Sequence, residues 1–148
     1  MLKDTFTAIQ GKLNTIQAIN YVGEDWGQLD YYSDRPPTRF PCVLFDVGDL
    51  DYVDRTAGIQ DALGTITLRV ADSVVRNVSS KAPDADPGKA YKMYDLLEDI
   101  HKAIHGLEGE TFKKLKRVKL SRVLREDGIR EYVMKFKFSG VDTSAFRR

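Results

Sequence analysis

The segment Thr111–Phe138 constrains the fold more than any other part of the chain, because it has the pattern of a long β-hairpin. Strands are predicted over Phe112–Arg125 and Ile129–Phe138, because side chains expected on two opposite faces alternate over residues 117–124 and again over residues 131–138. The dipeptide Asp127-Gly128 between them is a favoured hairpin turn. We therefore expect two antiparallel strands here.

The alternation assigns one face of the hairpin to the core and the other to a basic surface. The side chains expected on the core face are Val118, Leu120, Arg122 and Leu124 from the first strand and Tyr132, Met134, Phe136 and Phe138 from the second. The opposite face is expected to carry Arg117, Lys119, Ser121 and Val123, followed by Glu131, Val133, Lys135 and Lys137.

A charge boundary coincides with the start of the hairpin. Residues 111–148 contain 12 Lys and Arg against 4 Asp and Glu, a net charge of +8, whereas residues 1–110 contain 11 against 18, a net charge of −7. The chain as a whole carries +1. Two oppositely charged surfaces can bind polyanions, or they can bind copies of the same molecule, basic face to acidic face.

Two helices are predicted from apolar side chains recurring three and four residues apart. The first covers about residues 2–20, with Leu2, Phe6, Ile9, Leu13, Ile16 and Ile19 on one face. The second begins near an expected N-cap at Asp86 and ends at Gly106. Its apolar face comprises Ala90, Met93, Tyr94, Leu97, Ile100 and Ile104.

Further strands are predicted between these helices. Pro41–Val47 is a short apolar run typical of a buried strand, and Ala62–Val70 alternates as a half-buried strand. A short strand is possible over Trp26–Tyr32, whereas Asp46–Asp61 is expected to be a polar connection. Arg76–Gly88 is expected to be a flexible loop.

These elements predict one α+β domain over residues 1–148, with a mainly antiparallel β-sheet and two α-helices packed on one face. No apolar run approaches the ~20 residues that a membrane span requires, and no secretory signal pattern is present. The single Cys42 lies in an apolar run, so we expect a buried thiol and a reducing cytoplasm.

No constellation of residues favours catalysis, so no cofactor is expected and the chain is not predicted to be an enzyme. His101 and His105 share a helical face but lack further ligands for zinc. The four residues Asp46, Asp49, Asp51 and Asp54 lack the calcium-loop pattern, which makes a solvated turn or an acidic contact surface more probable than a metal site.

The basic hairpin leaves two binding modes open. Nucleic-acid phosphates could be contacted by Lys113, Lys114, Lys116, Arg117, Lys119, Arg122, Arg125, Lys135 and Lys137. However, Tyr132, Phe136 and Phe138 alternate away from the lysines, which favours core positions over a base-stacking surface. Alternatively, copies could associate head to tail and close a ring. The candidate subunit interface then comprises acidic Asp49, Asp51 and Asp54, and basic Arg117, Lys119, Lys135 and Lys137.

The order of these segments resembles that of the tail-terminator and tail-completion proteins of long-tailed bacteriophages and their prophages. The resemblance rests on the N-terminal amphipathic helix and on four segments: RPPTRFPCVLF (35–45), GTITLRV (64–70), YDLLEDIHKAIHGL (94–107) and FKFSGVD (136–142). It covers most of the chain, but it lies in pattern and order rather than in a specific motif.

The resemblance implies a non-enzymatic virion protein without a cofactor. Such proteins form a ring, usually hexameric, on the head-proximal end of the tail tube, where the ring stops tube polymerisation and contacts the head connector. The expected partners are thus other copies of this chain, the tail-tube protein and the head-connector protein, with no membrane. The expected location is the cytoplasm of the bacterial host and then the virion tail, and the loop 76–88 could become ordered on assembly.

Overall fold

The computed structural model of the protein describes residues 1–73, 81 and 87–148. Within this part of the chain the elements follow the order α1 (Leu2–Leu13), β1 (Tyr21–Glu24), β2 (Cys42–Asp46), β3 (Leu50–Asp54), β4 (Gln60–Asp72), α2 (Pro87–Ile104), β5 (Lys116–Val123) and β6 (Arg130–Asp142). The loop expected over residues 76–88 lies almost entirely outside the described residues, as does the expected N-cap Asp86.

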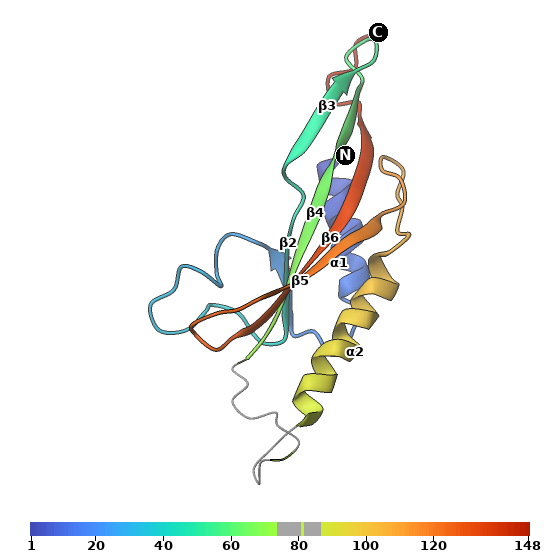
Figure 1. Ribbon diagram of the computed structural model, residues 1–148. Coiled ribbons are helices and arrows are strands. Elements are labelled where there is room, and N and C mark those ends of the chain that lie inside the picture. Colours follow the sequence, from blue (N-terminus) through green and yellow to red (C-terminus); the bar gives the residue numbers. More distant parts are fainter. Residues whose placement is uncertain (74–80, 82–86) are drawn as a thin grey trace.

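The strands form one six-stranded sheet, and the fold class is α+β as predicted. Its order is β1-β2-β4-β6-β5. β2 and β3 both pair with the same side of β4: β3 pairs with its first half and β2 with its second half. Only β1 and β2 are parallel; all other neighbours are antiparallel. Because β4 and β6 are long, they extend with β3 beyond the helices as an arm, whose tip lies near the C-terminus (Figure 1).

Both helices pack on one face of the sheet, as predicted. Ile9 and Leu13 from α1 join one buried cluster with Met93, Leu97, Ile100 and Ile104 from α2. The sheet contributes to the same cluster Phe45 from β2, Ala62, Ile66, Leu68 and Val70 from β4, and, as predicted, Tyr132, Met134, Phe136 and Phe138 from β6. This face is called the helix-side face below.

The opposite face, called the open face below, is covered by described residues only at one end. There the segment 25–41 packs Leu29 against a second, smaller buried cluster that includes Cys42, Leu44, Ala71 and Ile129. Further along the strands, Thr65, Thr67 and Lys135 are only partly buried and no helix covers them. The open face is therefore available on the arm side of the sheet.

The first helix is shorter than the predicted range 2–20. It ends at Leu13, and two further turns follow, in which Ile16 N–H donates to Leu13 O at 3.1 Å and Ile19 N–H donates to Ile16 O at 3.2 Å. Because these turns keep a spacing of three residues, Ile16 and Ile19 still reach the core. The apolar spacing was therefore informative about burial but not about helix length.

Two predictions between the helices are wrong. The short strand suggested over residues 26–32 does not form; β1 lies earlier, at Tyr21–Glu24, and Trp26 and Tyr31 are exposed. The expected polar connection 46–61 contains β3, because Leu50–Asp54 pairs with β4. Its aspartates lowered its apparent strand propensity, but the pairing with a neighbouring strand outweighed that preference.

The predicted core face of the first hairpin strand is also wrong. Val118 and Leu120 are 60% and 45% exposed, because β5 is an edge strand that the described helices do not cover, and Leu124, which follows β5, is 84% exposed. A bulge between Arg117 and Lys119 shifts the alternation. Arg117 and Leu120 therefore lie on the same face, where their cross-strand partners on β6 are Phe136 and Met134. The connection between β5 and β6 contains Asp127-Gly128 as predicted, with Gly128 at φ 77°, but it spans residues 124–129, whereas the predicted strands left only residues 126–128.

Candidate functional site

The basic hairpin divides its charges between the two faces of the sheet. On the open face Lys116 lies opposite Lys137, and Lys119 lies opposite Lys135. On the helix-side face β5 instead carries Arg117 and Arg122. The sequence-predicted basic residues are thus brought onto one hairpin, but not onto one surface.

The four open-face lysines form two directly opposed like-charged pairs, an arrangement that costs folding free energy. Among the described residues, none of the four makes an ion pair. Lys116 and Lys137 also border a hollow of about 480 Å³ with Lys113, Lys114, Glu108 and Ser139. This lysine quartet (Lys116, Lys119, Lys135 and Lys137) is therefore a surface suited to a negatively charged partner.

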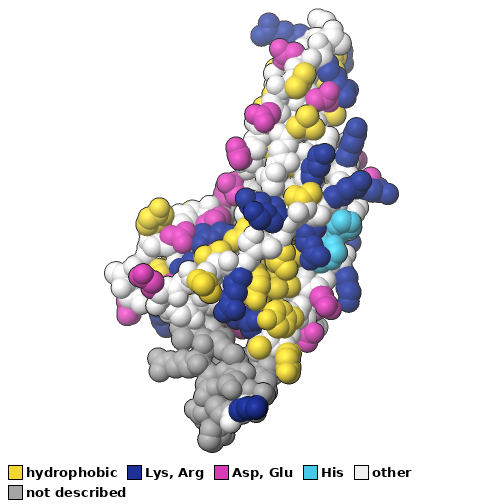
Figure 2. Space-filling view, in the orientation of Figure 1, with side chains coloured by type: hydrophobic (Ala, Val, Ile, Leu, Met, Phe, Trp, Pro, Cys, Tyr) yellow, Lys and Arg dark blue, Asp and Glu magenta, His cyan; other side chains and the backbone are white. Residues whose placement is uncertain are grey.

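The acidic candidates lie on the other side of the arm. Asp51 and Asp54 are exposed on β3, and Asp49 immediately precedes this strand with φ 59°. Figure 2 shows acidic side chains along the side of the arm where Figure 1 places β3, and basic side chains gathered on the opposite side. The two candidate surfaces therefore lie on opposite edges of one sheet.

Asp54 is tied locally, because Gln60 Nε2 donates to its Oδ1 at 2.6 Å. At the arm tip Arg55 forms an exposed ion pair with Asp61 at 2.7 Å. In the described part of the chain, no group of three or more His, Cys, Asp or Glu is arranged to hold a metal ion. The acidic surface is thus a set of separate carboxylates along a strand.

One residue of the predicted phosphate-contacting set is used internally. Arg125 is 11% exposed, donates to Glu131 at 3.0 Å and to Asp127 at 2.7 Å, and also donates to the carbonyl oxygen of Leu29. Arg69 donates to the same Glu131 oxygen at 2.7 Å and to Asp30 at 2.8 Å. Arg125 therefore belongs to an internal network that fastens the segment 25–41 to the sheet.

The electrostatics of this network are those of paired charges. The hydrogen bond from Arg125 holds the pKa of Asp127 far below its ordinary value of 3.8, and the hydrogen bond from Arg69 lowers the pKa of Asp30. Conversely, the hydrogen bond that Arg69 donates to Asp30 raises the pKa of Arg69. Sequence analysis missed this network, because strand register, which brings Arg69 and Glu131 together, was not encoded in any local pattern.

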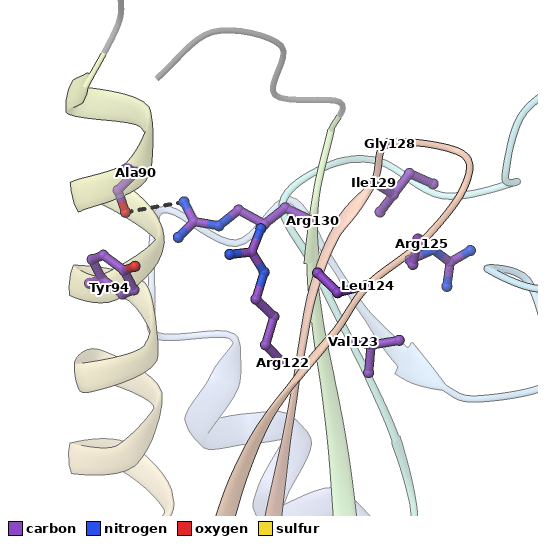
Figure 3. Close-up of a pocket in the computed structure, with 9 residues that line it drawn as sticks. All are labelled: Ala90, Tyr94, Arg122, Val123, Leu124, Arg125, Gly128, Ile129 and Arg130. Atoms are coloured by element: carbon purple, nitrogen blue, oxygen red, sulfur yellow. Dashed lines mark hydrogen bonds between the residues drawn. The ribbon is translucent and has the colours of Figure 1, made fainter. Parts of the chain in front are cut away.

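A separate cavity of about 340 Å³ lies between α2 and the hairpin, near the turn (Figure 3). Arg130 crosses it to donate to the carbonyl oxygen of Ala90 at 3.3 Å, and its guanidinium lies 5.0 Å from the centre of the Tyr94 ring. This contact joins the start of α2 to β6. Tyr94 is 48% exposed, so its predicted place on the buried helix face is only partly correct.

The two histidines make local contacts. Their rings meet edge to face at 4.8 Å, and Nδ1 of His105 accepts a hydrogen bond from the backbone N–H of Arg117 at 3.1 Å. Desolvation, followed by the positive charge of Arg117, lowers the pKa of His101. His105 therefore helps to position the first residues of β5 beside the end of α2.

The remaining candidates occupy buried positions. Cys42 is fully buried as predicted, and burial raises the pKa of its thiol to about 11. The predicted core positions of Tyr132, Phe136 and Phe138 are confirmed, so they are not available as a base-stacking platform beside the lysines.

None of the helices in the described residues combines the length and apolar character needed to cross a membrane.

The described elements define a small α+β protein with two helices on one face of a mainly antiparallel sheet. No protein-family model matches the chain, and no curated protein sequence matches it. Among solved structures, a chain from the virion of a native gene transfer agent particle is similar, with a TM-score of 0.63 and 10% sequence identity. The likeness covers 95% of this chain and 96% of that chain, so the two share a fold over nearly their whole lengths.

Proposed function

We propose that this protein is a non-enzymatic structural component of a phage-like virion, and that it forms a ring on the head-proximal end of the tail tube. The observation that carries the proposal is the shared fold over 95% of this chain with a chain of a gene transfer agent virion. The order of segments that resembles tail-terminator and tail-completion proteins supports the more specific role at the end of the tube.

The distribution of charge supports a ring. A head-to-tail ring requires two different surfaces that complement each other on every copy, and here the acidic β3 edge and the basic β5 edge lie on opposite sides of the sheet. The subunit interface that we propose pairs Asp49, Asp51 and Asp54 of one copy with Arg117, Lys119, Lys135 and Lys137 of the next. The ring would be hexameric and would contact the tail tube on one side and the head connector on the other.

Tube length tests the role. A tail-tube protein from the same source genome is expressed alone and together with this chain, and tube lengths are measured by negative-stain electron microscopy. We expect tubes of uncontrolled length without this chain and shorter, capped tubes with it. The double variant Lys92→Glu with Lys102→Glu, which changes charge on the exposed surface of α2 and not at the proposed interface, should still cap. Tube lengths that do not respond to this chain would contradict the proposed role.

The lysine quartet favours a second candidate function, nucleic-acid binding. Opposed lysines without ion pairs among the described residues suit phosphates as well as carboxylates. If all four contact phosphates, the logarithm of the binding constant for duplex DNA should fall with the logarithm of salt concentration with a slope of about −3.6. Fluorescence anisotropy with labelled DNA measures this slope, and absence of binding at low salt would exclude the candidate.

A further inference from the structure

Two edges of the sheet carry strands with unpaired backbone and opposite charge. β3 pairs only with β4, and β5 pairs only with β6, among the described strands, although the N–H of Arg117 at the start of β5 is taken by His105. An exposed edge strand presents unpaired N–H and C=O groups that can pair with a strand of another molecule. Both strands also expose apolar side chains: Tyr52 and Val53 on β3 are 41% and 56% exposed, and Leu120 on β5 is 45% exposed.

We infer that β3 of one copy pairs with β5 of the next copy, so that the sheets of neighbouring subunits join into one continuous antiparallel sheet. The inference rests on the proposed ring and specifies the contact that would build it. It replaces a contact between side chains alone with backbone hydrogen bonds between two edge strands.

Charge selects this pairing over the alternatives. β5 against β5 would place Lys119 and Arg122 beside their own copies, and β3 against β3 would place Asp51 and Asp54 beside theirs; both arrangements bring like charges together. Only β3 against β5 brings opposite charges together. If both edges carried the same sign of charge, every edge pairing between copies would bring like charges together. Opposite signs on the two edges instead disfavour self-pairing and permit head-to-tail pairing.

Strand direction agrees with a ring. From β3 through β4 and β6 to β5, every neighbouring pair is antiparallel, so β3 and β5 run in opposite directions. Rotation about an axis roughly along the strands preserves direction, so the β3 of the next copy would lie antiparallel to β5. The alternation of the sheet would therefore continue across the subunit boundary.

The faces of the two strands also correspond. On the open face β3 presents Asp51, which lies opposite Leu63, and β5 presents Lys116 and Lys119. On the helix-side face β3 presents Tyr52 and Asp54, and β5 presents Arg117, Leu120 and Arg122. Joining the strands with their faces aligned therefore brings acids beside bases on both faces and apolar side chains beside each other on the helix-side face.

β1 is the other edge on the same side of the sheet, but it suits this role less. Its four residues Tyr21–Glu24 contain a single carboxylate, and three of them are partly buried. By contrast, four of the five residues of β3 are exposed and two are acidic. We therefore assign the contact to β3.

The two edges are staggered along the strands, and this stagger has a geometric consequence. β3 pairs with residues 60–64 of β4, whereas β5 lies across β6 from residues 65–71 of β4. Joining the edges would require the strands to tilt relative to the ring axis, as strands do in closed barrels with a shear. The arm would then overlap the neighbouring subunit.

Cross-linking between two singly labelled variants tests the contact directly. One variant carries Val53→Cys on β3 and the other carries Ser121→Cys on β5, both on the open face, and the buried Cys42 is replaced by alanine in both. The mixed variants are treated with a short bis-maleimide linker. We expect cross-linked dimers in the mixture and few in either variant alone. Because the linker captures brief contacts, this result is expected even if the free protein is largely monomeric.

Exchange of charge provides an independent readout. Asp51→Lys is added to the Val53→Cys variant, and Lys119→Glu is added to the Ser121→Cys variant. Each change alone should reduce cross-linking about tenfold. Introducing both, one on each side of the contact, should restore it. The controls Lys92→Glu and Glu98→Lys, on the exposed surface of α2, make the same changes of charge and should have no effect.

The outcomes separate this inference from the proposed function. Absence of cross-links in the mixture, or equal cross-linking in each variant alone, would overturn the β3–β5 contact, whether or not the protein caps tail tubes. Efficient β3–β5 cross-linking in a protein that leaves tube length unchanged would support the contact and contradict only the proposed role.

Discussion

Arg69 and Glu131 are 62 residues apart in the sequence, yet Nη2 of Arg69 lies 2.7 Å from Oε1 of Glu131. Glu131 is only 2% exposed and also accepts a hydrogen bond from Arg125 at 3.0 Å. Both arginines reach Asp30, which lies in the segment 25–41. The pair thus joins β4 to the connection between β5 and β6 and to the segment 25–41, which covers the smaller buried cluster.

Replacing Arg69 with methionine should destabilise the protein by about 3 kcal/mol, because removing one partner leaves a buried carboxylate less well compensated. Urea unfolding followed by circular dichroism measures the loss. Arg55→Met is the matched control: its ion pair with Asp61 is largely exposed, so we expect a cost of no more than about 1 kcal/mol. Equal costs for both variants would show that the Arg69 network adds no stability.

The same network predicts how stability responds to acid. The folded-state pKa of Asp127 and of Asp30 lies below the ordinary value of 3.8, so folding favours their charged forms. Their contribution is fully present above the unfolded-state pKa and is lost as pH falls through the folded-state pKa. Asp127→Asn keeps a favoured turn dipeptide but removes the charge. The difference in unfolding free energy between wild type and this variant should be constant above about pH 5 and shrink at lower pH.

A difference that stayed constant from neutral pH down to strong acid would contradict this assignment, since it would show that the charge of Asp127 is not the cause. Denaturant titrations at several pH values supply the comparison.

Cys42 should be unreactive in the folded protein. Its thiol is fully buried and its pKa is raised to about 11, so little thiolate is present at neutral pH. We expect slow labelling by iodoacetamide in buffer and rapid labelling in denaturant, measured by mass spectrometry. Fast labelling of the native protein would mean that the segment 25–41 opens readily.

The basic hairpin should contribute to self-association through its open face. Lys135→Glu with Lys137→Glu should weaken assembly while leaving the fold intact, because both side chains point away from the core. Size-exclusion chromatography with light scattering, at low and high salt, measures the change. The control Lys92→Glu with Lys102→Glu alters α2 by the same charge. An unchanged oligomer in the hairpin variant would remove these two lysines from the interface.

Local periodicity in the sequence predicted the elements whose burial is regular. Strand β4, strand β6 and helix α2 lie near the predicted positions, and Phe136 and Phe138 have their predicted orientation. In these elements a single face meets the core along the whole length, so spacing and burial carry the same information.

Elements at the edges of the sheet were less predictable. In β3 the aspartates masked a strand that pairing with β4 stabilises, and in β5 the bulge after Arg117 changed which side chains share a face. The exposure of Leu120 follows from where the helices end, which is a tertiary property. The opposite charges were visible in the sequence, but their placement on two open strand edges required the structure.

The most direct measurement of the central claim is electron microscopy of tail tubes mixed with this protein carrying a gold label. The account predicts one labelled ring at a single end of each tube, and reduced occupancy when Lys119→Glu is introduced. Label distributed along the tube wall, or tubes without label at either end, would contradict the claim that this chain caps the tail tube as a ring.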